Sequence, residues 1–187
     1  MGKLKISFNA PVTLTFAFVS FATLVLSYVT NGASNTLLFM TYHSSLTDPL
    51  TYVRFFTHVL GHANWSHYLG NMSYILLLGP MLEEKYGSDR LLQVIGITAF
   101  ITALINYILF PDIALCGASG VVFAMILLAS FANFKNGEIP LTLILIAIIY
   151  LGREVYSGIL VVDQVSNLSH VIGGIVGACI GYSFNKK

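Results

Sequence analysis

The chain has 187 residues, of which 56% are hydrophobic and only 9% are charged, and its mean hydropathy is +0.81. This composition excludes a soluble globular protein and indicates an integral membrane protein. The formal net charge of +1 gives no electrostatic basis for binding nucleic acid. Cys116 and Cys179, the two cysteines, lie in apolar surroundings and predict neither a disulfide framework nor a cysteine-based zinc site.

The first apolar run, residues 11–30, is about 20 residues long, which is enough to cross a hydrocarbon core of about 30 Å. A cleaved signal peptide is the alternative, but this run is long for one and Thr30-Asn31-Gly32 is a poor cleavage site. We therefore expect a retained membrane helix. Residues 31–66 are too polar to span, so we expect a long first loop with short elements lying in the membrane interface and Trp65 in an aromatic belt.

Further apolar runs follow, each closed by polar or turn-forming residues. They cover residues 67–81, 91–110, 119–134, 139–155 and 165–184. With the first run they predict an all-α membrane protein, a bundle of six transmembrane helices in a single domain over residues 1–187. Placing both termini in the cytoplasm leaves only Arg54 and Arg153 of the nine Lys and Arg residues on the outer side, as the positive-inside rule requires. We expect a multi-pass protein of the cell (plasma) membrane.

A serine stands between glycines where a loop turns into the fourth long run, in the sequence Cys-Gly-Ala-Ser-Gly of residues 116–120. Ser119 is therefore predicted at a helix N-terminus, where unpaired N–H groups favour a developing oxyanion. Residues 119–134 would form a helix of about 24 Å, shorter than the hydrocarbon core, so Ser119 should be recessed in a water-filled cavity. A small-residue patch for helix packing is the alternative reading of the same pattern.

The predicted topology places polar side chains of three runs in the outer half of the membrane. His170 is the natural base for Ser119, because a serine hydroxyl is a weak nucleophile without one. His67 and Asn71 share a helix face through their i, i+4 spacing and could donate hydrogen bonds to an oxyanion beside the Ser119 amide. The alternatives are a histidine satisfied by a backbone carbonyl and a polar pair that bridges helices.

Glycines recur every four residues after His170, at Gly173, Gly177 and Gly181. Such spacing gives a helix a smooth face that can lie close against a neighbour. If that neighbour is the helix that begins at Ser119, the serine and the histidine meet across the contact.

From Tyr52 to Tyr182 the chain resembles the rhomboid family of intramembrane serine proteases. The resemblance is carried by the family's Gly-x-Ser-Gly, His-x-x-x-Asn and His-x-x-Gly-x-x-x-Gly motifs and by an acidic turn. These stand here as Gly117-Ala118-Ser119-Gly120, as His67 to Asn71 with His62 five residues earlier, as His170 with Gly173 and Gly177, and as Glu83 with Gly87-Ser88.

The resemblance implies a serine endopeptidase that cuts transmembrane segments of membrane proteins near the outer side of the bilayer. It implies a Ser119–His170 dyad and an oxyanion site from the Ser119 amide, His67 and Asn71. It implies no cofactor, no metal and no nucleic acid partner, and it leaves the oligomeric state open. The supporting residues are expected to be Gly117, Gly120, His62, Phe123, Gly173 and Gly177.

Two positions depart from the family pattern. Val53 precedes Arg54 where the family usually has Trp-Arg, and Phe123 stands where many members have a tyrosine that packs on the catalytic histidine. The resemblance also implies lateral substrate access past the fifth run and the loop of residues 156–164, with Gly158 allowing the loop to move as a lid.

Two other functions stay open. The first is a catalytically silent rhomboid relative that binds or delivers membrane proteins, although such relatives typically lack the serine or the histidine. The second is a metal site, because His58, His62 and His67 cluster within ten residues. No His-Glu-x-x-His motif accompanies these histidines, and a catalytic zinc would be short of ligands.

Overall fold

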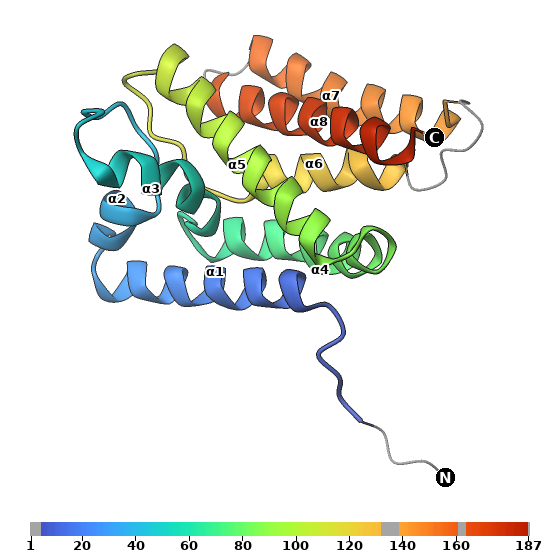
Figure 1. The fold of residues 1–187 in the computed structure, drawn as a ribbon. Helices are drawn as coiled ribbons and strands as arrows, with labels where there is room; N and C mark the ends of the chain where they lie inside the picture. The colour runs from blue at the N-terminus through green and yellow to red at the C-terminus, as the bar shows by residue number, and fades with distance from the viewer. Residues whose placement is uncertain (1–4, 132–138, 161–163, 187) are drawn as a thin grey trace.

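The computed structural model describes residues 5–131, 139–160 and 164–186, and within these residues every regular element is a helix. The helices are α1 (Pro11–Val29), α2 (Ala33–Leu38), α3 (Pro49–Thr57), the 3-10 helix η1 (His58–Leu60), α4 (Trp65–Tyr86), α5 (Ser88–Leu109), α6 (Ser119–Ser130), α7 (Leu141–Leu160) and α8 (Gln164–Asn185). The longer helices lie side by side, and α2 and α3 gather beyond one end of α1 (Figure 1). The predicted all-α class is confirmed.

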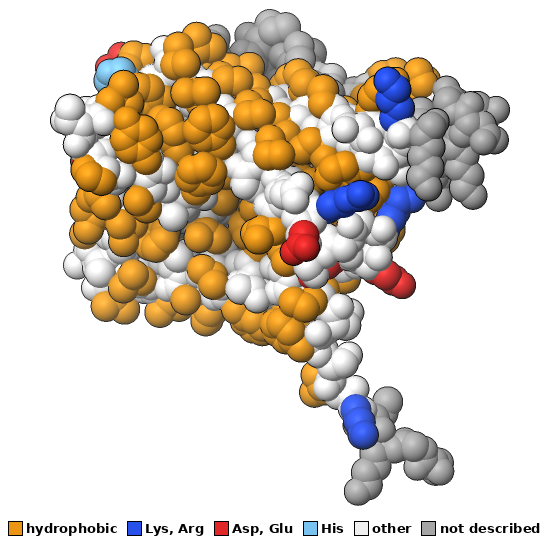
Figure 2. Space-filling view, viewed as in Figure 1, with side chains coloured by type: hydrophobic (Ala, Val, Ile, Leu, Met, Phe, Trp, Pro, Cys, Tyr) orange, Lys and Arg blue, Asp and Glu red, His pale blue; other side chains and the backbone are white. Residues whose placement is uncertain are grey.

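Three described segments are long and apolar enough to cross a membrane, judged by length and composition: residues 11–29, 88–109 and 167–185. Residues 119–130 and 141–150 form shorter apolar helices. On the face shown in Figure 2 apolar side chains dominate, and Lys, Arg, Asp and Glu gather mainly at the end of the bundle near the C-terminus and on the N-terminal segment. The chain is therefore an integral membrane protein, while the count of six spans stays a prediction.

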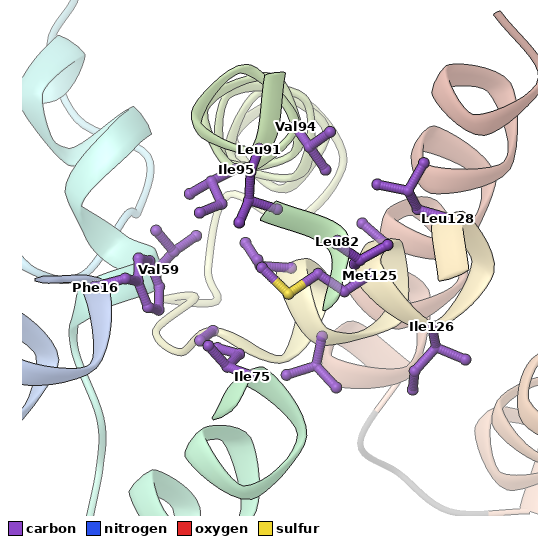
Figure 3. Packing of buried hydrophobic residues seen from close by; sticks show 14 of the residues in the cluster. Phe16, Val59, Ile75, Leu82, Leu91, Val94, Ile95, Met125, Ile126 and Leu128 are labelled. Carbon is purple, nitrogen blue, oxygen red and sulfur yellow. The ribbon is translucent and has the colours of Figure 1, made fainter. Parts of the chain in front are cut away.

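Helix α6 lies at the centre of the bundle, and all of its residues from Gly120 to Leu128 are buried. It contacts α4, α5, α7 and α8, so it has no face left for solvent or lipid. A helix that is apolar all round suits such a position. Figure 3 shows Met125 of α6 among the buried side chains of α4 and α5, including Leu82 and Leu91.

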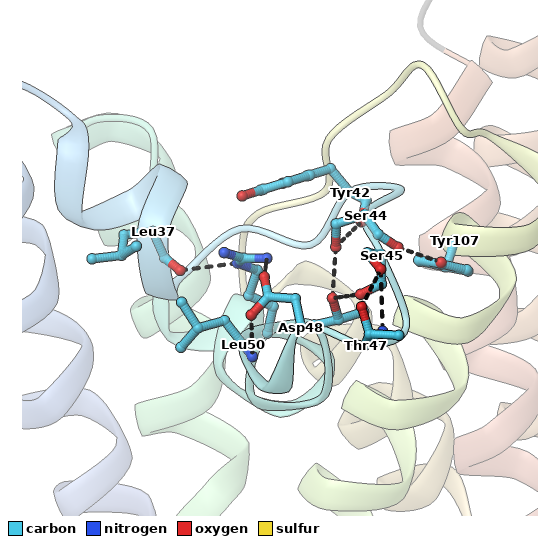
Figure 4. A network of polar contacts seen from close by, with 10 residues as sticks. Leu37, Tyr42, Ser44, Ser45, Thr47, Asp48, Leu50 and Tyr107 are labelled. Atoms are coloured by element: carbon cyan, nitrogen blue, oxygen red, sulfur yellow. Dashed lines mark hydrogen bonds and ion pairs between the residues drawn. The ribbon is translucent and has the colours of Figure 1, made fainter.

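The connection between α1 and α4, residues 30–64, carries α2, α3 and η1 and is organised by one buried arginine. Arg54 is only 4% exposed. Its Nε donates to the carbonyl oxygen of Leu37 (2.9 Å), and its Nη1 lies 3.4 Å from Oδ2 of Asp48. The hydroxyl of Tyr107 in α5 donates to the carbonyl oxygen of Ser44 (2.5 Å), so this connection is anchored to the bundle (Figure 4).

Helix α4 continues beyond the expected end of its apolar run at Met81 and includes the charged residue Glu83. The Glu83 carboxylate is buried and accepts hydrogen bonds from the Val12 amide (2.8 Å), from the Thr13 amide (3.0 Å) and hydroxyl (2.9 Å), and from the Ser88 hydroxyl (2.8 Å). These amides belong to the first turn of α1, whose own N-cap residue makes no side-chain cap. Helix α4 can therefore extend past its apolar residues, because the charge of Glu83 is stabilised by the N-terminus of α1.

The predicted lid loop of residues 156–164 is wrong in its first half. Helix α7 runs to Leu160, and α8 begins at Gln164, while residues 161–163 lie outside the described part of the chain. Gly158, which is expected to let this loop move, lies within the helix, because a glycine in a helix interior costs only about 1 kcal/mol and need not end it. The fourth run was expected to reach residue 134. Helix α6 ends at Ser130, and residues 132–138 lie outside the described residues.

Candidate active site

Ser119 is the first residue of α6 and is partly exposed, whereas the residues that follow it are buried. The turn into the helix is made by Gly117, whose φ of +131° is strongly disfavoured for residues with a side chain. Ala118, the N-cap residue, provides no side-chain hydrogen bond to the first amides. The N-terminal N–H groups of α6 are thus available to an anion beside Ser119.

The loop before Ser119 is shaped by the connection of residues 30–64. Thr41 and Leu115 exchange two backbone hydrogen bonds of 2.9 and 2.8 Å, and the Gly117 amide donates to the carbonyl oxygen of His58 (2.9 Å). These bonds fix the loop on both sides of Cys116. Burial raises the pKa of the Cys116 thiol to about 12, so this thiol stays neutral beside the site.

His58 has a structural role that sequence reasoning missed. Its ring is buried, with Nδ1 3.2 Å from the carbonyl oxygen of Arg54 and Nε2 3.4 Å from the hydroxyl of Thr102. Burial lowers the pKa of His58 to about 4. Both ring nitrogens face protein partners, so this ring is not free to hold a metal ion. Its sequence position beside other histidines gave no hint of this role.

Helix α8 lies against α6 through its glycines. A methyl group at Gly173 would overlap the backbone of Gly120, and one at Gly177 would overlap the backbone of Ala124. A methyl group at Gly120 would lie 3.5 Å from the carbonyl oxygen of Ser169. The neighbour expected from the glycine spacing is therefore the observed one.

His170 is held over an aromatic ring of α6. Its imidazole stacks on Phe123 with ring centroids 4.5 Å apart and an angle of 5° between the planes. Phe123 is one helical turn after Ser119, and Ser169 adjoins Gly120. Ser119 and His170 consequently lie at the same end of the contact between α6 and α8.

The N-terminal end of α4 brings His67 and Asn71 to the same region. Asn64 caps this helix, because its side chain accepts a 2.9 Å hydrogen bond from the His67 amide. The His67 ring covers Gly117, where a methyl group would lie 2.5 Å from Cε1 of the imidazole. His62 packs edge-on against His67, with ring centroids 5.1 Å apart.

Two polar atoms in this region have no hydrogen-bond partner among the described residues. They are Nδ2 of Asn71, in a side chain that is 7% exposed, and Nε2 of His62, in a side chain that is fully buried. Buried polar atoms without partners are uncommon and costly. Nε2 of His62 is an acceptor, because Nδ1 of the same ring donates to the carbonyl oxygen of Leu60 (3.1 Å). Asn71 offers an unused donor one helical turn after His67, and an oxyanion site requires such donors.

The helices, the buried charge and this group of polar side chains at one end of α4, α6 and α8 define a helical integral membrane protein with a polar centre. The family model for the Rhomboid domain matches residues 49–187. The chain therefore belongs to the rhomboid family.

Individual relatives agree with this assignment. The chain is 28% identical over 137 residues to the rhomboid protease GlpG of Haemophilus influenzae, covering 71% of this chain and 70% of that protein. It is 32% identical over 161 residues to Rhomboid-related protein 2 of Mus musculus, covering 74% of this chain and 52% of the relative. It is 28% identical over 179 residues to the rhomboid protease GluP of Bacillus subtilis, covering 90% of this chain and only 34% of the relative.

Proposed function

We propose that this protein is an intramembrane serine endopeptidase that cleaves transmembrane segments of other membrane proteins near the outer side of the bilayer. Ser119 is the nucleophile, and His170 is the base. The Ser119 amide, the His67 ring and the Asn71 side chain bind the oxyanion. The proposal includes six membrane spans, with both termini in the cytoplasm of a cell whose plasma membrane holds the protein.

The reaction follows from these roles. The Ser119 hydroxyl attacks the carbonyl carbon of the scissile peptide bond, and His170 takes the hydroxyl proton. The negative charge that develops on the carbonyl oxygen is stabilised by the donors of α4 and α6. His170 then gives the proton to the leaving amine, and a water molecule activated by the same histidine hydrolyses the acyl enzyme.

One observation carries the proposal: the glycine face of α8 lies on the backbone of α6, with His170 stacked one helical turn from Ser119. A packing role for the small residues alone would not require a histidine at the end of this contact. The unpartnered Nδ2 of buried Asn71 adds support, because a purely structural asparagine would use its donors.

The second candidate is a catalytically silent rhomboid relative that binds or delivers membrane proteins. Some relatives of the chain carry the name rhomboid-related rather than protease, which keeps this candidate in view. Binding alone, however, has no use for a serine at a helix N-terminus beside a histidine and a spare amide donor.

Labelling of the purified protein with a fluorophosphonate separates the two candidates. We expect labelling and cleavage of a single-span reporter by the native chain, and loss of both in Ser119→Ala. His170→Ala should be equally inactive, and the double variant no worse than either single one, because groups that act as a unit are not additive. Absence of labelling in the folded native chain would favour the binding protein.

A further inference from the structure

Three aromatic rings from three helices form a continuous series that ends at His170. Tyr150 of α7 packs edge-to-face with Phe123 of α6, with centroids 6.0 Å apart and planes at 80°. Phe123 in turn stacks on His170 of α8. Sequence analysis gave no reason to connect Tyr150 with the site, because it lies in the middle of an apolar run.

Tyr150 also borders empty space. It lines a cavity of about 320 Å³ between α4, α6 and α7, together with Tyr74, Leu78, Ile126 and Ile146 among others. Phe123 is 9% exposed, and its neighbours along α6, from Gly120 to Leu128, are buried. If the Tyr150 ring were shortened, the space released beside the cavity would let Phe123 turn away from the histidine, because close packing is what keeps a side chain in one rotamer.

The Phe123 ring can do more for His170 than fill space. When the histidine takes the serine proton it becomes an imidazolium, and a cation within about 6 Å of an aromatic centroid is attracted to the ring face. The parallel stack therefore fixes the orientation of the imidazole. Among the described titratable side chains, His67 of α4 interacts electrostatically with His170, whereas Tyr150 reaches it only through Phe123.

From these contacts we infer that Tyr150 is a positioning residue for the base. It holds Phe123 in the stack, and it thereby couples the position of α7 to the orientation of His170. A displacement of α7 would change the orientation of His170 through Phe123, without any contact between α7 and the reacting atoms. The inference rests on the proposed function, since it assigns His170 the role of base.

The test measures the rate of fluorophosphonate labelling of Ser119 in the purified full chain, for Phe123→Leu, Tyr150→Leu and Tyr150→Phe. Removing the Phe123 face should slow labelling by roughly two- to thirty-fold, the range of a cation–π contact with the imidazolium that forms during the reaction. Tyr150→Leu should slow labelling by less. Tyr150→Phe keeps the ring and should restore the native rate, which a role of the hydroxyl would not allow.

Phe100→Leu is the matched control, because it removes a ring stacked on Phe56 (centroids 5.7 Å apart) at another place in the bundle. It should leave the labelling rate unchanged. The Tyr150→Leu and Phe123→Leu effects should not add, because both act through one ring. A native labelling rate in Tyr150→Leu, or full additivity, would overturn the inference. A native chain that labels no serine at all would instead overturn the proposed function.

Discussion

Asn71 and His58 are both buried polar side chains, but they use their hydrogen-bonding capacity differently. Both ring nitrogens of His58 face protein oxygens, and its carbonyl oxygen holds the Gly117 amide. Asn71 keeps Nδ2 without a partner among the described residues. An unpaired buried donor costs about 1–3 kcal/mol, so a side chain that keeps one is better explained by a ligand than by stability.

Asn71→Ala should lower reporter cleavage by about two orders of magnitude, because it removes one of several oxyanion donors. Labelling of Ser119 should stay detectable, and thermal unfolding in detergent should change little, since no described hydrogen bond of Nδ2 is lost. Ser73→Ala, an exposed position on the same helix, is the control and should be fully active. Loss of the folded state in Asn71→Ala would instead indicate that the side chain bridges helices.

Gly117→Ala should inactivate the protein without touching any side chain of the proposed dyad. The new methyl group would lie 2.5 Å from Cε1 of His67, at a residue whose φ of +131° already disfavours a side chain. Displacing an oxyanion donor typically costs about 100- to 1000-fold in rate. Gly70→Ala, whose methyl group would meet no atom within 4 Å, should retain native cleavage in the same assay. Equal activity of the two variants would contradict the placement of His67.

The burial of His58 predicts a loss of stability in acid. Its pKa is lowered to about 4 in the folded state, against 6.5 ordinarily. The unfolded chain therefore binds the extra proton between these two values, and the contribution to stability is present above about pH 6.5 and is lost as the pH falls toward 4. His62, whose pKa burial and the neighbouring His67 also lower to about 4, adds to the effect.

Thermal unfolding in detergent between pH 7.5 and pH 4.5 measures this effect. In His58→Gln the number of protons taken up on unfolding should fall by about one, which flattens the dependence by up to about 1.4 kcal/mol per pH unit. His43→Gln changes an exposed histidine and should keep the native dependence. An unchanged slope in His58→Gln would show that the ring is not buried as described.

The pairing of α6 with α8 was predictable at the scale of the helix, whereas the pairing of α1 with α4 through Glu83 was not. The spacing of Gly173, Gly177 and Gly181 indicates a face for close approach, and the structure places that face on α6. Nothing in the sequence shows that Glu83 accepts hydrogen bonds from the first turn of α1, which lies about 70 residues earlier in the chain. Such a cap between two helices depends on how tertiary packing places them.

The same distinction applies to the rest of the site. Local patterns locate Ser119 at a helix start and put His67 and Asn71 on one face, since both follow from helical periodicity. Other contacts join segments that have no sequence pattern in common. The Tyr150 ring packs on Phe123, and the carbonyl oxygen of His58 accepts from the Gly117 amide. Hydrophobic periodicity cannot distinguish one apolar side chain from another at such contacts.

Glu83→Gln should destabilise the contact between α1 and α4. The neutral amide keeps the shape but presents N–H groups where the carboxylate accepts from Val12, Thr13 and Ser88, and it loses the favourable interaction with the N-terminal dipole of α1. We expect a loss of about 1.5–3 kcal/mol in unfolding free energy, the range for hydrogen bonds to a charged group. Glu84→Gln, the exposed neighbour, should unfold like the native chain in denaturant titrations of the detergent-solubilised protein.

The face of the molecule shown in Figure 2 is mainly apolar, whereas the polar side chains of the candidate site lie in the N-terminal parts of α4, α6 and α8. An intact substrate helix cannot deliver a peptide bond to such a centre, because its carbonyl oxygens are occupied by internal hydrogen bonds. Under the proposed function, a substrate helix would therefore have to unwind before Ser119 could attack it. Gly and Pro make unwinding easier, since they cost about 1 and 3 kcal/mol relative to Ala in a helix interior.

A single-span reporter tests this requirement. Replacing the Gly and Pro residues in the outer half of its span by Leu should reduce cleavage strongly, while the same replacements in the inner half should have little effect. Mass spectrometry of the products should locate the cut in the outer half, after a small residue, because Gly117, Ala118 and Gly120 leave a narrow approach to the serine. Undiminished cutting of the all-Leu span, or a cut on the cytoplasmic side, would refute both the unwinding step and the proposed topology.

The two hydrogen bonds between Thr41 and Leu115 bear on the order in which the chain folds. They join a segment before α4 to the loop before Ser119, so they close a long stretch of chain, and contacts of high sequence separation form late relative to helices. We therefore expect the loop around the serine to take its final shape only when residues 30–64 are in place. Under the proposed function, a newly made chain with every helix inserted would stay inactive until this pairing forms.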